Sequence, residues 1–348
     1  MYKTFFLSLL LCLNLVGCTD KSDSFSSFDE ARSALKSLNT VLILGQESNN
    51  IKVTEENIVY SNEYLDKRHA IYQQLMTMKL TPNQITQVNY LVIAERFPER
   101  FFPWPAQVDV LHNMSLFNRS TSTVEQTISW LKFTQAKLDI AKQSNLKLNK
   151  LEYSLLQGYV AQAIENKATQ GAIKSHIRAF SNYLDNYKPR GSVGLRGLSN
   201  GSEWYQSKLN YYGNAVNSPL EWVVIINEKI KALESAVINV KFKQNHTKSF
   251  AVQYLSKEPL INGLDWQTHY LDLPAMASNT KLSNNDKLLM LTMMETDIGI
   301  HYHAWTIDQA KVNLSKRLKV SEQTAQYLVE DIILYPGQSF SFCGQICY

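Results

Sequence analysis

The sequence predicts a mainly α-helical protein with at most a few short strands, and three observations carry that prediction. Four segments begin with a capping box, in which a Ser or Thr caps the first turn and a Glu or Gln three residues later reaches back to it. Apolar residues behind these starts recur near helical spacing. Alternating strand patterns are scarce, and the β-branched run 41–44 fits a strand or a buried helix equally well.

The first element along the chain is a leader peptide. Residues 1–17 combine Lys3, an apolar core of about a dozen residues and small residues at the end, which is typical of a secretory signal. The core is too short for a membrane-spanning helix, which needs roughly 20 apolar residues. Cleavage after residue 17 would leave 348 − 17 = 331 residues, which permits one large domain or two modest ones.

The leader ends in Leu15-Val16-Gly17-Cys18, and this ending resembles a bacterial lipobox. The resemblance implies cleavage before Cys18 and attachment of fatty acyl chains, palmitate among them, which would anchor the protein in a lipid bilayer. The next residue is Thr19 and not Asp, which by the sorting rule of enteric bacteria implies the outer membrane, facing the periplasm. Residues 18–27 would then be the lipidated cysteine and a polar tether. The alternative is an ordinary signal peptide followed by a chance cysteine.

The helix starts follow in order along the rest of the chain. Two of the four place Pro at the first helical position, where its missing N–H group is not needed. The predicted capping residues are Thr81, Ser122, Ser218 and Thr306.

A glycine-rich stretch at 189–201 interrupts the helical pattern. It is either a long ordered loop or a boundary between an N-terminal helical region, 28–189, and a C-terminal region, 190–348, and the two regions could also form one continuous domain. A second polar break spans 278–285.

Composition narrows the function classes. The net charge of +4 is nearly balanced, so nothing points to nucleic acid, and no later run is apolar enough to cross a membrane. Cys12 would leave with the leader and Cys18 would carry lipid, which excludes a disulfide-built fold. Cys343 and Cys347 have a spacing that fits a bridge on a last helical turn, or they are two free thiols.

Two common hydrolase motifs are missing. None of the seven histidines is followed by Glu and no two are spaced by four, so the zinc-peptidase motif His-Glu-x-x-His does not occur. The segment Gly197-Leu198-Ser199-Asn200-Gly201 matches the nucleophile-elbow pattern of serine hydrolases, but the strand that the mechanism requires before the serine is not predicted. We interpret this segment as a turn in which Asn-Gly supplies a positive φ.

Two carboxylate–histidine pairs at helical spacing are the remaining candidates for chemistry. Asp265 precedes His269 by four residues, and Asp297 precedes His301 by four, so on helices each pair would share a face. A nearby carboxylate orients an imidazole. The pairs, with His303, could bind a metal or relay protons; the structural alternative is a helix-surface pair or a satisfied core histidine.

Three segments also follow one family pattern. Residues 296–301 read Thr-Asp-Ile-Gly-Ile-His and precede Trp305 and Gln309, residues 334–342 contain Pro-Gly-Gln, and residues 194–205 contain Gly-Leu, Asn-Gly and Tyr205. These segments resemble the bacterial domain of unknown function 885 (DUF885) family, over about 190–234 and 285–342.

The resemblance implies a zincin-like helical fold, with departures. Family members bind zinc through a His-Glu-x-x-Pro-Gly-His helix and a downstream Glu; this chain lacks both motifs and is shorter between 234 and 285. Asp297, His301 and Gln338 keep positions thought to line the family's cleft, and are the candidate catalytic residues. The chain stops at Tyr348 where relatives continue, which implies a shortened branch or a truncated reading frame.

Two functional classes follow from these expectations. The first is a catalytically degenerate outer-membrane lipoprotein without a metal cofactor, which binds a peptide or an envelope protein. The second is a metal-dependent hydrolase whose rebuilt zinc site uses His269, His301 and His303 with Asp265 or Asp297.

Overall fold

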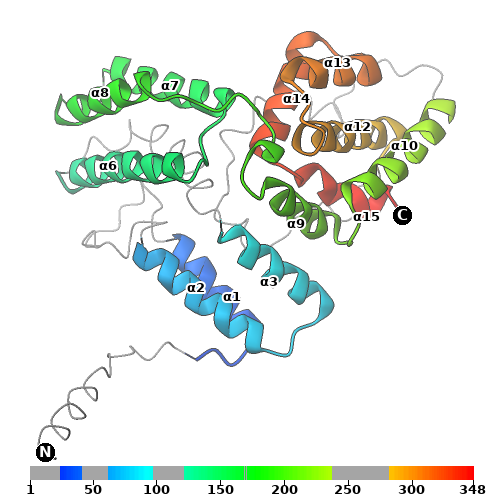
Figure 1. Cartoon of the computed structure of the whole chain (residues 1–348), viewed down its shortest axis with the longest axis horizontal. Helices are drawn as coiled ribbons and strands as arrows, with labels where there is room; N and C mark the ends of the chain where they lie inside the picture. Colours follow the sequence, from blue (N-terminus) through cyan, green and yellow to red (C-terminus); the bar gives the residue numbers. More distant parts are fainter. Residues whose placement is uncertain (1–23, 41–61, 97–120, 168, 170, 237–281) are drawn as a thin grey trace, which may run out of the picture.

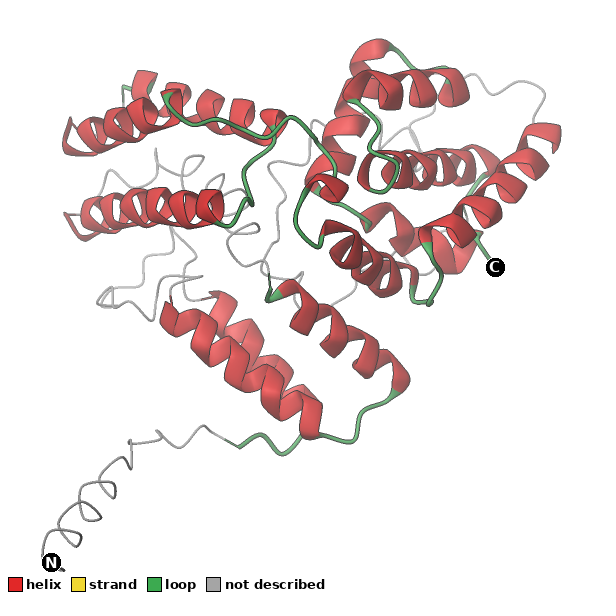
Figure 2. Cartoon of the chain, in the orientation of Figure 1, coloured by secondary structure: helices red, strands yellow, loops and turns green. Residues whose placement is uncertain are grey.

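The computed structural model describes residues 24–40, 62–96, 121–167, 169, 171–236 and 282–348. Regular structure within these ranges is helical, and no strand occurs in them (Figure 2). The predicted mainly α fold class is therefore confirmed. The ambiguous run 41–44 lies outside the described ranges.

Three N-terminal helices form one side of the molecule (Figure 1). They are α1 (Phe28–Thr40), α2 (Asn62–Thr77) and α3 (Pro82–Ala94). Helix α2 packs against both α1 and α3, and α3 packs against α9 (Gly201–Gly213) of the C-terminal part. Their apolar faces contribute to the same core as the C-terminal helices, so residues far apart in sequence stabilise one another.

A second group of helices has a core of its own. It consists of α6 (Thr121–Gln143), α7 (Lys150–Glu165) and α8 (Gly171–Asp185), and α8 packs against both other helices (Figure 1). The apolar residues of α8 recur every three or four positions, which places them on one face of the helix. Those buried on this face are Ile173, Ile177, Phe180 and Leu184.

The C-terminal helices surround α12 (Asn284–His301) (Figure 1). Helix α12 packs against α10, α13, α14 and two short 3-10 helices, η2 and η4. It is buried on nearly every side, as expected for a helix without a polar face. The bounds of its neighbours are η2 (Leu195–Gly197), α9 (Gly201–Gly213), α10 (Pro219–Ala236), α13 (Ile307–Leu318), α14 (Glu322–Leu334), η4 (Gln338–Phe342) and α15 (Cys343–Ile346).

Capping explains where several helices begin. The predicted boxes at Thr81 and Thr306 form as expected, and Ser218 exchanges the same pair of hydrogen bonds with Glu221. The prediction of Ser122 as the capping residue is wrong, because α6 already begins at Thr121 and Ser122 therefore lies inside the helix. Two further capping boxes were not predicted. In Asn149–Glu152 the capping residue is Asn instead of Ser or Thr, and in Ser283–Asp286 the third helical residue is Asp instead of Glu or Gln.

The glycine-rich stretch is an ordered loop that runs from α8 to α9. Arg190 fastens it: its backbone N–H donates to Leu148 O at 2.9 Å and its guanidinium donates to Lys147 O at 3.0 Å and Gly194 O at 2.8 Å. Asn200 has a φ of 53°, so the expected Asn-Gly turn with positive φ is present. The division of the chain into two regions at residue 190 stays a prediction.

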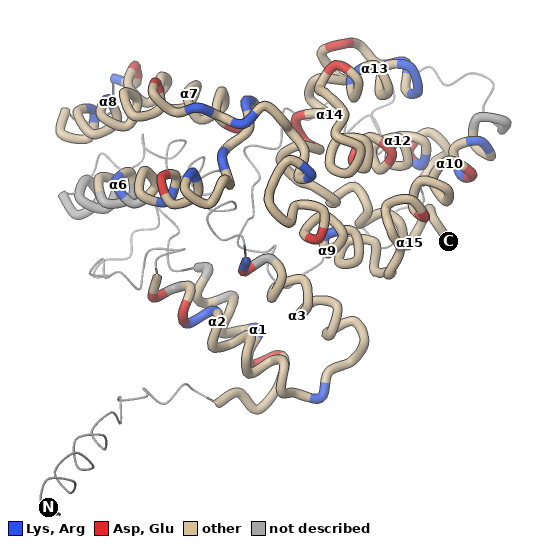
Figure 3. The backbone as a smooth tube through the Cα atoms, viewed as in Figure 1, with Lys and Arg blue, Asp and Glu red and all other residues tan. Residues whose placement is uncertain are grey.

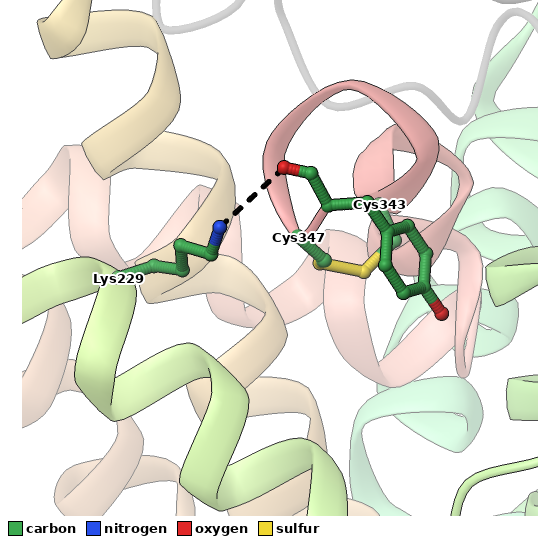
Figure 4. The surroundings of a disulfide bond; sticks show 4 residues. Lys229, Cys343 and Cys347 are labelled. Carbon is green, nitrogen blue, oxygen red and sulfur yellow. Dashed lines mark hydrogen bonds between the residues drawn. A yellow bond between two sulfur atoms is a disulfide. The ribbon is translucent and has the colours of Figure 1, made fainter.

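A disulfide joins Cys343 and Cys347 across the last helical turn, with a Cα–Cα distance of 4.8 Å (Figure 4). The sequence left this pairing open. Next to it, Lys229 Nζ of α10 donates to the Tyr348 carbonyl oxygen at 3.5 Å. Trp222 of α10 also packs edge-on against Phe340 of η4, with ring centroids 5.4 Å apart. These contacts hold the last described residues against α10.

Charged residues of both signs are spread over all three helix groups (Figure 3). This distribution agrees with the small net charge of +4. Within the described ranges, no helix combines the length and the apolar content that crossing a membrane requires.

Candidate functional site

Asp297 is the centre of a buried polar cluster inside the C-terminal helices. Its side chain is fully buried on α12, and its oxygens accept hydrogen bonds from two other elements. Tyr205 Oη of α9 donates to Oδ1 at 2.7 Å, and Ser339 Oγ of η4 donates to Oδ2 at 3.0 Å. The Gly337 backbone N–H donates to both oxygens, at 3.1 and 2.9 Å. One carboxylate thus ties α9, α12 and η4 together.

Burial dominates the protonation of Asp297. It raises the pKa of this carboxyl from the usual 3.8 to about 7, because the charged form loses its hydration. The hydrogen bonds from Tyr205, Ser339 and Gly337 and the positive charge of Lys208 oppose that rise. Burial, and then the Asp297 charge, raise the pKa of Tyr205 well above 10, which keeps its hydroxyl a donor.

Lys208 supplies a cation close to this carboxylate. It lies one turn after Tyr205 on α9 and is only 4% exposed. Its ammonium lies 5.0 Å from the Trp204 ring and 5.4 Å from the Tyr90 ring, and it donates to Tyr90 Oη at 3.2 Å. Aromatic faces stabilise a desolvated cation, and this replaces part of its lost hydration.

His301, the last residue of α12, is also fully buried. The Leu195 backbone N–H donates to its Nδ1 at 3.2 Å, so Nδ1 acts as an acceptor and the proton lies on Nε2. Nε2 then donates to Ile332 O of α14 at 3.0 Å. The two ring nitrogens join η2 to α14 across the end of α12, and neither has a lone pair directed at an open site.

Two glycines allow the elements around His301 to approach each other. A Cβ atom at Gly194 would lie 2.0 Å from Ile300 O, and one at Gly299 would lie 2.2 Å from the Trp305 ring. Both distances are far below van der Waals contact, so only glycine fits. The glycine of the Gly-Leu segment therefore allows the chain just before η2 to pack closely on α12, and the glycine of the Gly-x-His segment allows Trp305 to do so.

The other candidate residues have different surroundings. Gln338 is half-buried at the start of η4, between Gly337 and Ser339, the two residues that donate to Asp297. His303 is exposed in the turn after α12. Cys18, Asp265 and His269 lie outside the described ranges.

The structure brings only part of the predicted constellation together. Asp297 and His301 share α12 and are both buried, as one of the sequence interpretations, a satisfied core histidine, expects. The described ranges contain no group of three or more His, Cys, Asp or Glu side chains that could hold a metal ion. The arrangement cross-links backbone segments, and Asp297 and His301 are both 0% exposed and hydrogen-bonded within the protein.

Sequence reasoning missed the partners that complete the cluster. Tyr205 and Ser339 belong to the segments that resemble the family but carry no predicted role there, and Lys208 belongs to none of the predicted motifs. The sequence does contain a signal for Lys208. It follows Tyr205 by three residues on one helix, so the two are neighbours on the helix surface.

Comparison of the chain with protein-family models, with curated proteins and with solved structures finds no match in any of the three.

Proposed function

We propose that this protein is a lipid-anchored, non-catalytic lipoprotein of the bacterial outer membrane that faces the periplasm. In this proposal it is a degenerate relative of the DUF885 family, which keeps the helical framework and has lost the hydrolytic centre. Its role is then to bind a peptide or an envelope protein.

One observation carries the non-catalytic part of the proposal: Asp297 and His301 are both 0% exposed and hydrogen-bonded to the protein's own groups. A metal-binding histidine needs a nitrogen lone pair that points at the ion. A general base needs a proton to abstract within about 3 Å. Both requirements would break hydrogen bonds that hold η2, η4 and α14 to α12.

The lipid anchor rests on the sequence. The ending Leu15-Val16-Gly17-Cys18 and the polar residues after it support acylation, and the Ser-rich stretch before α1 supports a tether. Several acyl chains on one cysteine give stable anchoring, whereas one chain binds reversibly.

Two measurements test the proposal. Intact-mass analysis of the protein from membranes should show a chain that begins at Cys18 and carries fatty acyl groups, and Cys18→Ser should release the protein to the soluble periplasm. Persistence of the serine variant at the membrane would refute the anchor.

The second functional class, a metal-dependent hydrolase, makes the opposite prediction for metal content. It would need His269 and Asp265, with His303 as an accessible third ligand, since His301 is engaged on both nitrogens. Zinc that copurifies in stoichiometric amount, together with peptide hydrolysis, would favour this class over the proposed one.

A further inference from the structure

The first described residues lie at the same end of the molecule as the connection between α2 and α3. The Phe25 backbone N–H donates to Gln74 Oε1 in the last turns of α2, at 3.0 Å. Residues 24–28 therefore lie beside the connection 78–81. In Figure 1, the start of α1 and this connection lie together at the lower edge, and α13 lies at the upper edge.

Apolar side chains are exposed on both sides of this connection. Met76 in the last turn of α2 is 46% exposed, and Ile85 in the first turn of α3 is 47% exposed. Behind them, Met78 and Leu80 are half-buried and pack against the main core, which fixes the shape of the turn. We call the segment from Met76 to Ile85 the α2–α3 tip.

The covalent chain limits the distance between this tip and the proposed anchor. Cys18 precedes Ser24, the first described residue, by six positions. Six residues span at most about 20 Å even when fully extended. An acylated Cys18 therefore keeps the lower edge of the molecule close to the lipid headgroups, whatever the path of the residues between.

We propose that the α2–α3 tip is a membrane-docking surface, which rests on the phospholipid headgroups of the bilayer that holds Cys18. The inference rests on the lipid anchor of the proposed function. Met76 and Ile85 would enter the interface between headgroups and acyl chains, and exposed Lys79 would face the phosphates. The acidic residues of the neighbouring first turn of α1 are Asp29 and Glu30; Glu30 accepts hydrogen bonds from Ser26.

Docking by the tip would fix the orientation of the whole molecule. The upper edge in Figure 1, with α13, would point away from the bilayer. A single lipid anchor on a polar tether allows every orientation, so a second contact is needed to select one. The tip would therefore present the C-terminal helices to partners in the periplasm.

The test uses the full acylated protein bound to vesicles of phosphatidylethanolamine and phosphatidylglycerol. An environment-sensitive fluorophore is attached at Lys79→Cys on the tip or, as the matched control, at Val312→Cys on α13, where the native side chain is 65% exposed. We expect a blue-shifted emission at position 79 that spin-labelled lipids quench, and an unshifted, unquenched emission at position 312.

A double variant then isolates the apolar contact. Met76→Ser with Ile85→Ser should abolish the quenching at position 79 while the protein still floats with the vesicles. The matched control, Leu220→Ser with Val224→Ser on α10, removes two other exposed apolar side chains, 56% and 57% exposed, and should leave the quenching unchanged.

The outcomes separate the two proposals. Protein that floats with the vesicles but shows equal, water-like emission at positions 79 and 312 would overturn the docking surface and leave the anchor in place. Protein that carries no acyl group and does not float would refute the anchor, and the docking surface would fall with it. Thermal unfolding of each variant shows whether the label or the substitution has changed the fold.

Discussion

Replacing Asp297 by Ala should destabilise the fold strongly, because the carboxylate is the common acceptor for three donors. The substitution leaves the Gly337 N–H, the Tyr205 hydroxyl and the Ser339 hydroxyl without their acceptor in a fully buried position. An unsatisfied buried polar group costs about 1–3 kcal/mol. Partial relaxation of the hydroxyls lowers the sum, so we expect the free energy of unfolding to fall by about 4 kcal/mol at pH 5, below the raised pKa of Asp297.

Urea unfolding followed by circular dichroism measures this change. The control is Asp308→Ala on α13, which removes the same side-chain type from a position that is 88% exposed and lies 3.5 Å from Lys311. Exposed ion pairs contribute about 0–1 kcal/mol, so the control should unfold almost as the parent protein does. A loss below about 1 kcal/mol for Asp297→Ala, similar to the control, would refute the view that Asp297 holds α9, α12 and η4 together.

Three further predictions follow from the same geometry. Burial raises the pKa of Asp297 to about 7, so the folded state binds this proton more tightly than the unfolded state. The contribution of Asp297 to the free energy of unfolding is therefore fully present below pH 3.8 and is lost as the pH rises through 7. The parent protein should therefore lose about 2.5 kcal/mol relative to Asp297→Asn between pH 5 and pH 8, and an unchanged difference in urea unfolding would contradict the shift. Gly299→Ala should lower the melting temperature because its Cβ meets an indole ring at 2.2 Å, whereas Gly158→Ala on α7, which has no neighbour within 4 Å, should raise it slightly; equal effects would argue against the close packing. Removing the disulfide by Cys343→Ser with Cys347→Ser should cost about 2 kcal/mol, since its loop is short, and thermal unfolding with and without reductant checks this value.

Local sequence signals predicted much of the helical framework. Capping boxes at Thr81, Ser218 and Thr306 depend on residues three positions apart, so the sequence contains all the information needed to place those helix starts. The Asn-Gly turn at Asn200 is predictable for the same reason. The box at Asn149 departs from the Ser/Thr pattern, because Asn caps this helix, and so that pattern does not predict it.

The cluster around Asp297 could be predicted only in part. The four-residue spacing of Asp297 and His301 places both on one helix face, but it does not say whether that face is buried. Burial comes from η2, α9, α14 and η4, whose contacting residues lie between 31 and 106 positions away along the chain. No local pattern encodes such contacts, and so the burial of this pair and its hydrogen-bond partners could not be predicted from the sequence.

The metal content of the mature protein tests the central claim most directly. The claim is that Asp297 and His301 serve the fold and that no hydrolytic metal centre has been rebuilt around them. Protein purified from membranes without chelators should contain far less than one zinc per chain by elemental analysis, before and after incubation with zinc and dialysis. One tightly held zinc per chain that is lost in His269→Gln or in His303→Gln would contradict the account.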